Sequence, residues 1–350
     1  MQVKDIETKK DWDDFVLTLQ PNTFLQSWQW KQVQELDGEH VSMLGFYDHN
    51  KLVSACLVIL VHAKRGNYYL VPHGPIVKDE KEYKSVIQDL VIYVKAKSYK
   101  LKARPVALRI APLIETPDTD RSIFYQLGFR NAPMHVHAEL TWMLDIAKPE
   151  EELLQGMRKT TRHAVSKAEK EGVQVEIISD VSALERFWPL YDQTRSRHGF
   201  IPFSKQFMQS QAEIFGASHA MFFAIAIHEG KDIAGAMCMQ FGNTVFYYHG
   251  ASVKTSVPAA QLLQWRAILE AKKRGAVRYN FWGIAPERSD APRSLWRSGA
   301  RHHPFEGITV FKKGFGGYVI NYMHAQDLPL SWRYWPMWAV EMFRKKKRGF

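Results

Sequence analysis

The chain has 350 residues, of which 46% are hydrophobic, 13% aromatic and 24% charged, and its mass is 40.5 kDa. This composition excludes intrinsic disorder, collagen and coiled coil as the main architecture, and the length favours two domains of similar size. The formal net charge of +11 favours a polyanionic partner, either a nucleic acid or an anionic membrane surface. Residues 344–348, RKKKR, supply five of these charges, so the rest of the chain carries only +6.

The first residues, MQVKDIETKKDWDDF, are charged throughout and predict no secretory signal. The longest apolar run, residues 52–61, is shorter than the roughly 20 residues of a membrane-spanning helix. Cys56 and Cys238 both lie in apolar stretches, so we expect buried, reduced thiols and neither a disulfide framework nor a thiolate metal site. These features predict a cytoplasmic protein.

Hydrophobic patterning predicts the same order of elements in each half of the chain. In the first half, β-branched and aromatic runs bounded by Gly, Asn and Asp predict three hairpin-linked strands, followed by an amphipathic helix and a further strand. Their expected ranges are 43–47, 52–61, 68–77, 86–102 and 106–114. The second half repeats this order at 222–227, 233–241, 245–252, 259–274 and 277–285.

This order of elements is that of the GNAT acyltransferase unit. We therefore expect an α/β fold with mixed sheets, made of two tandem GNAT-like domains joined by residues 157–172. Acyltransferases that use coenzyme A hold its pyrophosphate on a glycine-rich loop at the start of the central helix. The segments before the two helices, HGPIVKDEKEYKS and HGASVKTSVPAA, lack such a loop, which disfavours ordinary acetyl-coenzyme-A chemistry.

Motifs for other kinds of chemistry are also missing. The sequence has no P-loop, no dinucleotide fingerprint and no Gly-x-Ser-x-Gly nucleophile motif. His135 and His137 share a face of a predicted strand, but no carboxylate or thiol stands at a matching ligand spacing. We therefore expect no metal and no cofactor.

Six segments carry a resemblance to one enzyme family. They are FLQSWQW (24–30), ELTWMLDI (139–146), MRKTTRHAVSKAEKEGV (157–173), VFYYHGAS (245–252), LLQWRAILEAKKRGAVRYNFWGI (262–284) and FKKGFGG (311–317). In these segments the chain resembles the Fem aminoacyltransferases, which build peptidoglycan cross-bridges from aminoacyl-tRNA. Since no long helical arm fits between residues 204 and 220, the resemblance is to the short, FemX-like form.

The resemblance implies two domains with different roles, one for the acceptor and one for catalysis. Residues 1–147, completed by 318–350, would form the first domain on the acceptor side, and residues 148–317 the catalytic second domain. The implied donor is an aminoacyl-tRNA, and the implied acceptor is the stem-peptide amine of a peptidoglycan precursor, which receives glycine, alanine or serine. Attack of an amine on an aminoacyl ester passes through an oxyanion that a fixed cation stabilises, and it needs no covalent enzyme intermediate.

The motif FKKGFGG holds the expected catalytic residues. The family's catalytic lysine maps onto Lys312, with Phe311 beside it as a wall for the substrate and Lys313 as a further substrate contact. Taken without the resemblance, the same residues are typical of a strand end that turns through glycines and exposes two solvated lysines.

A basic segment precedes the second domain's strands. Arg158, Lys159 and Arg162 open a predicted helix, and Arg158 and Arg162 lie one turn apart on the same face. We expect contacts to tRNA phosphates here, which are largely independent of sequence and sensitive to salt. The alternative is an ordinary solvated basic face.

The remaining expected substrate contacts come from several segments. Two departures from the family pattern leave the acceptor open: Ala111 stands where the family commonly has an aspartate, and Phe203 where it has an arginine. Period-2 alternation places Tyr247 and His249 on one face of their strand, where they line the cleft or pack in the core. The full set of expected substrate-binding residues is Lys31, Trp28, Arg109, Arg195, Lys205, Tyr247, His249, Trp282 and Lys313.

The C-terminal segment, WRYWPMWAVEMFRKKKRGF (332–350), predicts an amphipathic helix with a basic end. Its expected apolar face consists of Trp335, Trp338, Ala339, Met342 and Phe343. Aromatic anchors beside lysines are typical of a helix at an anionic membrane surface, and the alternative is a helix docked on the first domain. Peripheral contact with the inner face of the membrane would favour lipid II over soluble UDP-MurNAc-pentapeptide as the acceptor.

Two other functions stay open from the sequence. One is a tRNA-dependent or acyl-CoA-dependent N-acyltransferase that acts on a protein or a lipid. The other is a catalytically silent relative that binds membrane or nucleic acid. We expect the protein to act as a monomer.

Overall fold

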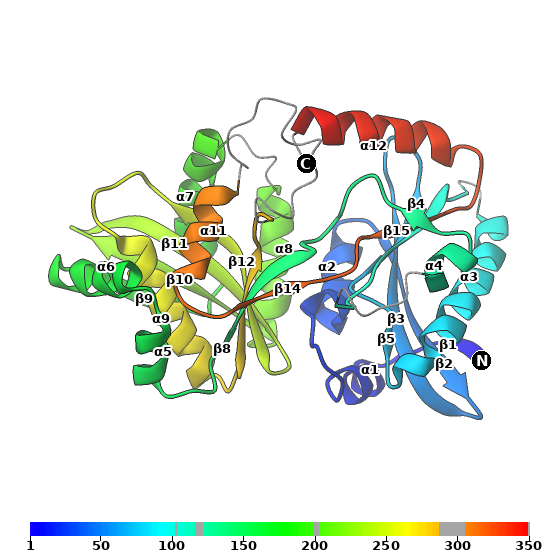
Figure 1. Cartoon of the computed structure of the whole chain (residues 1–350), viewed down its shortest axis with the longest axis horizontal. Coiled ribbons are helices and arrows are strands. Elements are labelled where there is room, and N and C mark those ends of the chain that lie inside the picture. The colour runs from blue at the N-terminus through cyan, green and yellow to red at the C-terminus, as the bar shows by residue number, and fades with distance from the viewer. Residues whose placement is uncertain (102–103, 116–121, 199–202, 287–304, 349–350) are drawn as a thin grey trace. The chain divides into compact units, whose positions relative to one another are not determined.

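The computed structural model describes residues 1–101, 104–115, 122–198, 203–286 and 305–348 (Figure 1). These residues form two compact units, each built on its own mixed sheet. Within the described ranges, unit 1 comprises residues 1–139, 286 and 321–348, and unit 2 comprises residues 140–285 and 305–320. The expected fold of two tandem mixed-sheet domains is confirmed.

Unit 1 has the strand order β1-β2-β3-β4-β6-β15-β7, with β5 paired to β3. Its neighbouring strands are antiparallel except β4 and β6, which run parallel from Tyr69 opposite Leu108 to Pro72 opposite Ala111. The strands are β1 (Gln2–Asp5), β2 (His40–Asp48), β3 (Lys51–Val61), β4 (Tyr68–Pro72), β5 (Ile76–Val77), β6 (Ala107–Ala111), β7 (Arg130–Asn131) and β15 (Gln326–Pro329).

Helices pack on both faces of this sheet because each buries an apolar stripe. On one face, Val86, Leu90 and Val94 of α3 join the core beneath β2, β3 and β6. On the other face, α1 buries Trp12, whose indole N–H donates to the Gln26 carbonyl at 2.8 Å. The helices of unit 1 are α1 (Lys9–Val16), η1 (Phe24–Gln26), α2 (Trp28–Leu36), η2 (Glu80–Glu82), α3 (Tyr83–Lys100), α4 (Ser122–Gln126) and α12 (Tyr334–Arg348).

Unit 2 has the strand order β14-β8-β13-β12-β11-β10-β9. Strands β12 and β13 run parallel, but their ladder is short: it begins at Thr244 opposite Arg278 and ends at Phe246 opposite Asn280. The two strands therefore separate beyond that point. The strands are β8 (Leu140–Asp145), β9 (Gln174–Ile178), β10 (Met221–His228), β11 (Lys231–Phe241), β12 (Thr244–Ser252), β13 (Arg278–Gly283) and β14 (Tyr318–Asn321).

Alternation along β10 shows how this sheet is covered. Phe222 and Ala224 belong to the core that α6 and α9 complete, whereas Phe223 faces the other way and meets Phe187 of α7 with 5.8 Å between ring centroids. Helix α9 ends at Lys273, and Gly275, two residues further on, has a φ of +81° that suits glycine. The helices of unit 2 are α5 (Glu150–Gly156), α6 (Lys159–Lys170), α7 (Ala183–His198), α8 (Lys205–Ala217), α9 (Ala259–Lys273) and α11 (Glu306–Lys313).

The boundary between the units differs from the predicted one. Strand β8 pairs with β13, so residues 140–145 belong to the sheet of unit 2, although the sequence suggested a first domain that extends to residue 147. Strand β14 lies beside β8 in the same sheet, so the return to unit 1 comes at residue 321 rather than 318. In both places, pairing within the second sheet decides where the unit ends.

Candidate active site

Lys312 occupies a buried position at the end of α11. Its side chain is 5% exposed, and Nζ donates to the carbonyl of Gly283 at 2.6 Å. Within the described part of the chain, no carboxylate pairs with it, and burial lowers its pKa to about 7. The sequence motif is thus a helix end rather than a strand end, and Lys312 is a desolvated amine instead of a solvated one.

The backbone that meets Lys312 is strained. Trp282 has φ +65°, a conformation that a bulky side chain rarely adopts. Its N–H donates to Asn280 Oδ1 at 2.7 Å, and the register between β13 and β8 shifts between Asn280 and Gly283. This irregularity lies directly before the carbonyl that accepts from Lys312. Strain held by surrounding contacts is typical of functional sites.

A β-bulge changes the expected facing of the tyrosine segment. His249 lies opposite Met237 and Tyr247 lies opposite Cys238, so Tyr248 is the extra residue on β12. Tyr247 packs on the core beneath α9, and its hydroxyl occupies the space that a Cβ on Gly250 would need. The prediction that Tyr247 and His249 share a face is therefore wrong, because a bulge interrupts the alternation on which it depended.

His249 faces the helices on the other side of the sheet. Its Nε2 lies 2.9 Å from Gln211 Oε1 of α8, and its ring meets Tyr191 of α7 at 6.1 Å. Burial lowers the pKa of His249 to about 3, so the imidazole is neutral at physiological pH. Phe203 also packs against it, with 5.3 Å between centroids, so the neutral imidazole lies among aromatic rings.

Aromatic contacts connect this end of the site to the strained strand. The Tyr248 ring lies 4.3 Å from the ring of His249 and 5.4 Å from that of Trp282, between centroids. Trp282 directly precedes Gly283, the partner of Lys312. We call Phe203, Tyr248, His249 and Trp282 the aromatic wall; it runs from the candidate catalytic lysine to Phe203, which is partly exposed.

Arg195 and Lys205, two of the expected substrate-binding cations, have acidic partners of their own. Arg195 pairs with Asp192 at 2.8 Å, and Lys205 pairs with Glu185 at 2.7 Å. Both pairs are partly exposed. Neither cation therefore replaces the family's arginine through any described contact, and their expected role in substrate binding stays a prediction.

Phe311 and Lys313, the neighbours of Lys312 in the motif, have structural contacts. The Phe311 ring packs on the core and meets Phe315 edge to face, with 5.4 Å between centroids. The Lys313 Nζ lies 5.3 Å from the centre of the Trp142 ring, and the Trp142 indole N–H donates to the Gly316 carbonyl at 2.7 Å. Lys312 and Lys313 thus have different surroundings although they are neighbours in sequence.

The basic helix start adjoins this motif. The Arg158 N–H donates to the Gly314 carbonyl at 2.9 Å, and Thr161 fills the space beside Gly314 where a Cβ would stand. The side chains of Arg158, Lys159 and Arg162 are exposed. The structure therefore brings the predicted tRNA-binding segment and the lysine motif together within unit 2.

Arg109 is part of a buried ion pair rather than a free substrate contact. Its side chain is 3% exposed, and it donates to both carboxylate oxygens of Asp327 at 2.7 and 2.8 Å. A further bond reaches Glu341 of α12 at 2.8 Å. The prediction of a substrate-binding Arg109 is thus corrected, because this guanidinium joins β6 to β15 and to α12.

The segment FLQSWQW (24–30) and the adjoining Lys31 include both surface residues and a buried glutamine that links two strands. Lys31 Nζ lies 4.7 Å over the Trp28 ring and 3.2 Å from Glu35, on the surface of unit 1. The buried Gln26 donates to the Pro72 carbonyl at 2.6 Å and accepts from the Leu57 N–H at 2.8 Å. Gln26 thus bridges β3 and β4. The sequence did not predict this role, and the only signal for it is a polar residue within an apolar segment.

Two other features of unit 1 contribute no candidate chemistry. In the described residues, no group of three or more His, Cys, Asp or Glu side chains is placed to hold a metal, and burial lowers the pKa of His137 to about 4.

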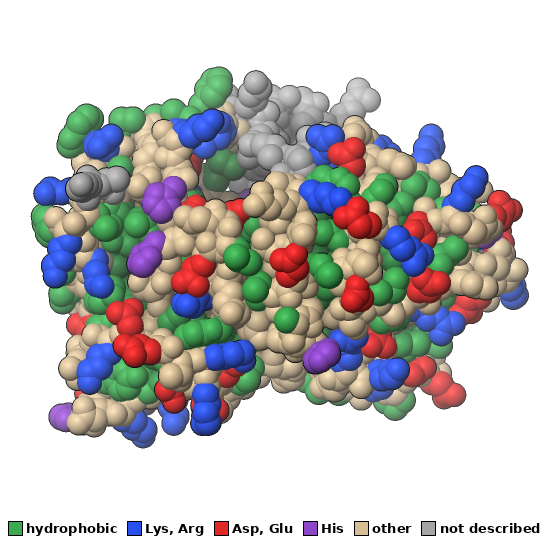
Figure 2. Space-filling view, turned by 180° about the vertical axis from the view of Figure 1, so that it is seen from behind, with side chains coloured by type: hydrophobic (Ala, Val, Ile, Leu, Met, Phe, Trp, Pro, Cys, Tyr) green, Lys and Arg blue, Asp and Glu red, His purple; other side chains and the backbone are tan. Residues whose placement is uncertain are grey.

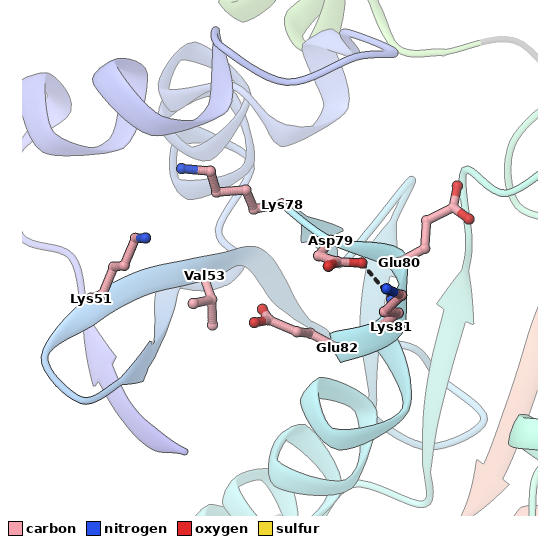
Figure 3. Close-up of a pocket in the computed structure, with 7 residues that line it drawn as sticks. All are labelled: Lys51, Val53, Lys78, Asp79, Glu80, Lys81 and Glu82. Carbon is pink, nitrogen blue, oxygen red and sulfur yellow. Dashed lines mark hydrogen bonds between the residues drawn. The ribbon is translucent and has the colours of Figure 1, made fainter.

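A surface hollow of unit 1 is lined by both acids and lysines, and the Lys81 N–H donates to Asp79 there at 2.9 Å (Figure 3). The lining residues are Lys51, Val53, Lys78, Asp79, Glu80, Lys81 and Glu82.

Comparison with known proteins identifies a protein family that matches nearly the whole chain. The model of the FemAB family matches residues 7–229 and 224–337. A Weissella viridescens protein, UDP-N-acetylmuramoylpentapeptide-lysine N(6)-alanyltransferase, is 24% identical over 202 residues, which cover 54% of this chain and 60% of that protein. Since the match spans less than two thirds of the relative, it compares only parts of the two proteins.

Solved structures confirm the architecture. The crystal structure of FemX is similar with a TM-score of 0.79 and 17% identity, over 97% of this chain and 99% of that one. L-PGS from Bacillus licheniformis gives 0.56 and 12%, over 96% of each chain. A tandem GNAT protein from the clavulanic acid biosynthesis pathway gives 0.54 and 12%, over 94% and 99%. No helix in the described ranges has the length and apolar character needed to cross a bilayer.

Proposed function

The chain belongs to the FemAB family, and we propose on this basis that it transfers glycine, alanine or serine from aminoacyl-tRNA to the stem-peptide amine of a peptidoglycan precursor. The observation that carries this proposal is the desolvated Lys312, hydrogen-bonded to Gly283 beside the strained Trp282. The name of the Weissella viridescens relative, an alanyltransferase that acts on a lysine of UDP-N-acetylmuramoylpentapeptide, supports the same class of reaction.

Lys312 would act on the charge that develops during transfer. The stem-peptide amine forms a bond to the ester carbonyl carbon, and the bond from that carbon to the tRNA ribose oxygen breaks. The Lys312 ammonium stabilises the oxyanion between these steps, and the proton lost by the attacking amine ends on the ribose oxygen. A pKa of about 7 allows Lys312 to give and regain a proton near neutral pH.

The donor would approach along the start of α6. The exposed side chains of Arg158, Lys159 and Arg162 lie in unit 2, and the backbone of Arg158 is hydrogen-bonded to the lysine motif. Basic side chains in this position suit the phosphates near the aminoacylated end of a tRNA. Unit 2 is thus proposed as the catalytic unit, and unit 1 with Lys31 and Trp28 as the acceptor side.

We favour lipid II over the soluble nucleotide precursor as the acceptor. Helix α12 leaves aromatic side chains exposed beside basic ones, which supports peripheral contact with the membrane. We propose that the protein acts as a monomer at the inner face of the membrane. A lipid headgroup as acceptor is the second candidate, favoured by that same helix.

The test offers purified protein radiolabelled glycyl-, alanyl- and seryl-tRNA with lipid II, UDP-MurNAc-pentapeptide or phosphatidylglycerol. We expect label to enter a peptidoglycan precursor, lipid II above the soluble one, and pretreatment of the donor with RNase to stop it. Label entering phosphatidylglycerol alone would select the second candidate. Incorporation that is indifferent to RNase, or no incorporation into any acceptor, would refute the proposed function.

A further inference from the structure

Helix α12 is fixed to unit 1 along one side. Tyr334 and Met337 are buried against Val106 and Ala107, and Trp338 packs on the same cluster. The sequence pattern placed Trp338 on the outer apolar face together with Trp335, but in the structure it turns toward the unit. The helix is therefore a docked element of unit 1.

Polar contacts reinforce this docking. Glu341 turns inward to accept from Arg109 at 2.8 Å, and the Tyr334 hydroxyl lies 3.1 Å from Asp327, the other partner of Arg109. Arg109 lies on β6 and Asp327 on β15. A buried ionic network thus fixes both the position and the rotation of α12, so the direction in which its other side chains point is set.

The opposite side of α12 is apolar and exposed. Phe343 is 69% exposed, and Trp332, which directly precedes the helix, is 77% exposed. The stretch from Trp335 to Val340 contains no charged residue, and Glu341 points inward. We call this side the α12 outer face; its residues are Trp332, Trp335, Pro336, Ala339, Val340, Met342 and Phe343.

Basic side chains lie at both ends of the α12 outer face. Arg333 is exposed at its start and Arg344 at its end. Lys345 is partly buried and lies near enough to His135 and His324 for its charge to act on them, and the sequence continues with three further basic residues. The Arg130 guanidinium lies 4.5 Å over the ring of Trp335. In Figure 2, hydrophobic side chains with Lys and Arg among them line the upper left edge, over the region of α12.

We propose that the α12 outer face is a preformed docking surface for an anionic lipid bilayer. Exposed Trp and Phe are suited to the boundary between headgroups and acyl chains, and adjoining Arg and Lys attract anionic headgroups. Apolar anchors and basic charge together provide the two signals that stable peripheral binding requires. This inference deepens the proposed function, which names the membrane as a partner, but it rests on the residues of α12 alone.

The test measures co-sedimentation of the full chain with vesicles of phosphatidylcholine, alone or with 30% phosphatidylglycerol, without tRNA or peptidoglycan precursor. We expect binding to the anionic vesicles that weakens as salt rises. The double variant Trp332→Glu/Phe343→Glu should bind at least tenfold more weakly. Arg344→Gln should lower the partition coefficient about fivefold, the factor that corresponds to about 1 kcal/mol for one basic residue near such a surface.

The matched control is Ile92→Glu, which changes a side chain of α3 in the same unit that is 65% exposed. Its binding should stay within twofold of wild type, and all variants should keep the wild-type circular dichroism spectrum. Equal binding to neutral and anionic vesicles, or undiminished binding of the double variant, would overturn the proposal. A third result would also overturn it: the wild-type protein does not bind vesicles and is a dimer in light scattering, whereas the double variant is a monomer. In that case a second copy of the chain covers the α12 outer face.

Discussion

Arg109 provides a quantitative test of how α12 and β15 are fixed. Replacement by Met keeps most of the side-chain volume but removes the partner of two carboxylates. Among the described residues, the fully buried Asp327 would retain only the hydrogen bond from the Tyr334 hydroxyl, and Glu341, 13% exposed, would lose its cation. Removing one member of a buried ion pair costs about 3–5 kcal/mol because the remaining charge is left without compensation.

The matched control is Arg186→Met in unit 2. Arg186 also reaches two carboxylates, bonding to Asp232 at 2.6 and 2.9 Å and to Glu176 at 2.6 Å, but its side chain is 36% exposed. Exposed pairs contribute only about 0–1 kcal/mol, since water screens them. The two variants therefore remove similar contacts in different surroundings.

Urea unfolding followed by far-ultraviolet circular dichroism measures both effects. With a slope of about 3 kcal/mol/M, Arg109→Met should lower the midpoint of the affected transition by roughly 1–1.7 M, and Arg186→Met by less than about 0.4 M. If Arg109→Met is as stable as Arg186→Met, the buried network does not hold α12. Lost transfer activity at unchanged stability would restore Arg109 as a substrate contact.

Two further predictions concern unit 2. Gly250→Ala should destabilise this unit by about 1–3 kcal/mol because the new Cβ displaces the Tyr247 hydroxyl. The control Gly156→Ala, with open space around it, should change stability by less than about 0.5 kcal/mol. Equal effects of the two variants in urea unfolding would show that Tyr247 does not need that space. The pKa of Lys312 is about 7 in the folded protein and 10.5 in the unfolded reference. Between these values the unfolded chain binds more protons than the folded one, so the free energy of unfolding should rise with pH from about 7 to 10. Lys312→Met should lose this rise, and identical pH dependence in the two proteins would contradict the burial of the amine.

The order of elements was predictable because each half carries strong local patterns. Runs such as 222–227 alternate between two buried faces, and Gly275 stops a helix where the sequence indicated. The boundary at residue 139 was not predictable, since it depends on the pairing of β8 with β13, which lies more than 130 residues further along the chain. Pattern identifies a strand but not the sheet that it joins.

The candidate site was predictable in outline through the resemblance. The motif placed Lys312, but its desolvation results from contacts with the distant Gly283 that no local pattern shows. The opposite facing of Tyr247 and His249 results from one extra residue in β12, and a bulge cannot be read from alternating hydrophobicity. Arg109 was misassigned because its partners lie more than 200 residues away.

The proposed function assigns to Lys312 the transfer of an aminoacyl group from tRNA. Its most direct test is the single-turnover rate of label transfer from aminoacyl-tRNA to lipid II by wild type, by Lys312→Met and by Lys231→Ala, an exposed lysine in the β10–β11 hairpin. We expect Lys312→Met to fold normally and to lose a factor of at least about 100 in rate, while Lys231→Ala keeps the wild-type rate. A folded Lys312→Met protein that transfers at nearly the wild-type rate would exclude Lys312 from the reaction.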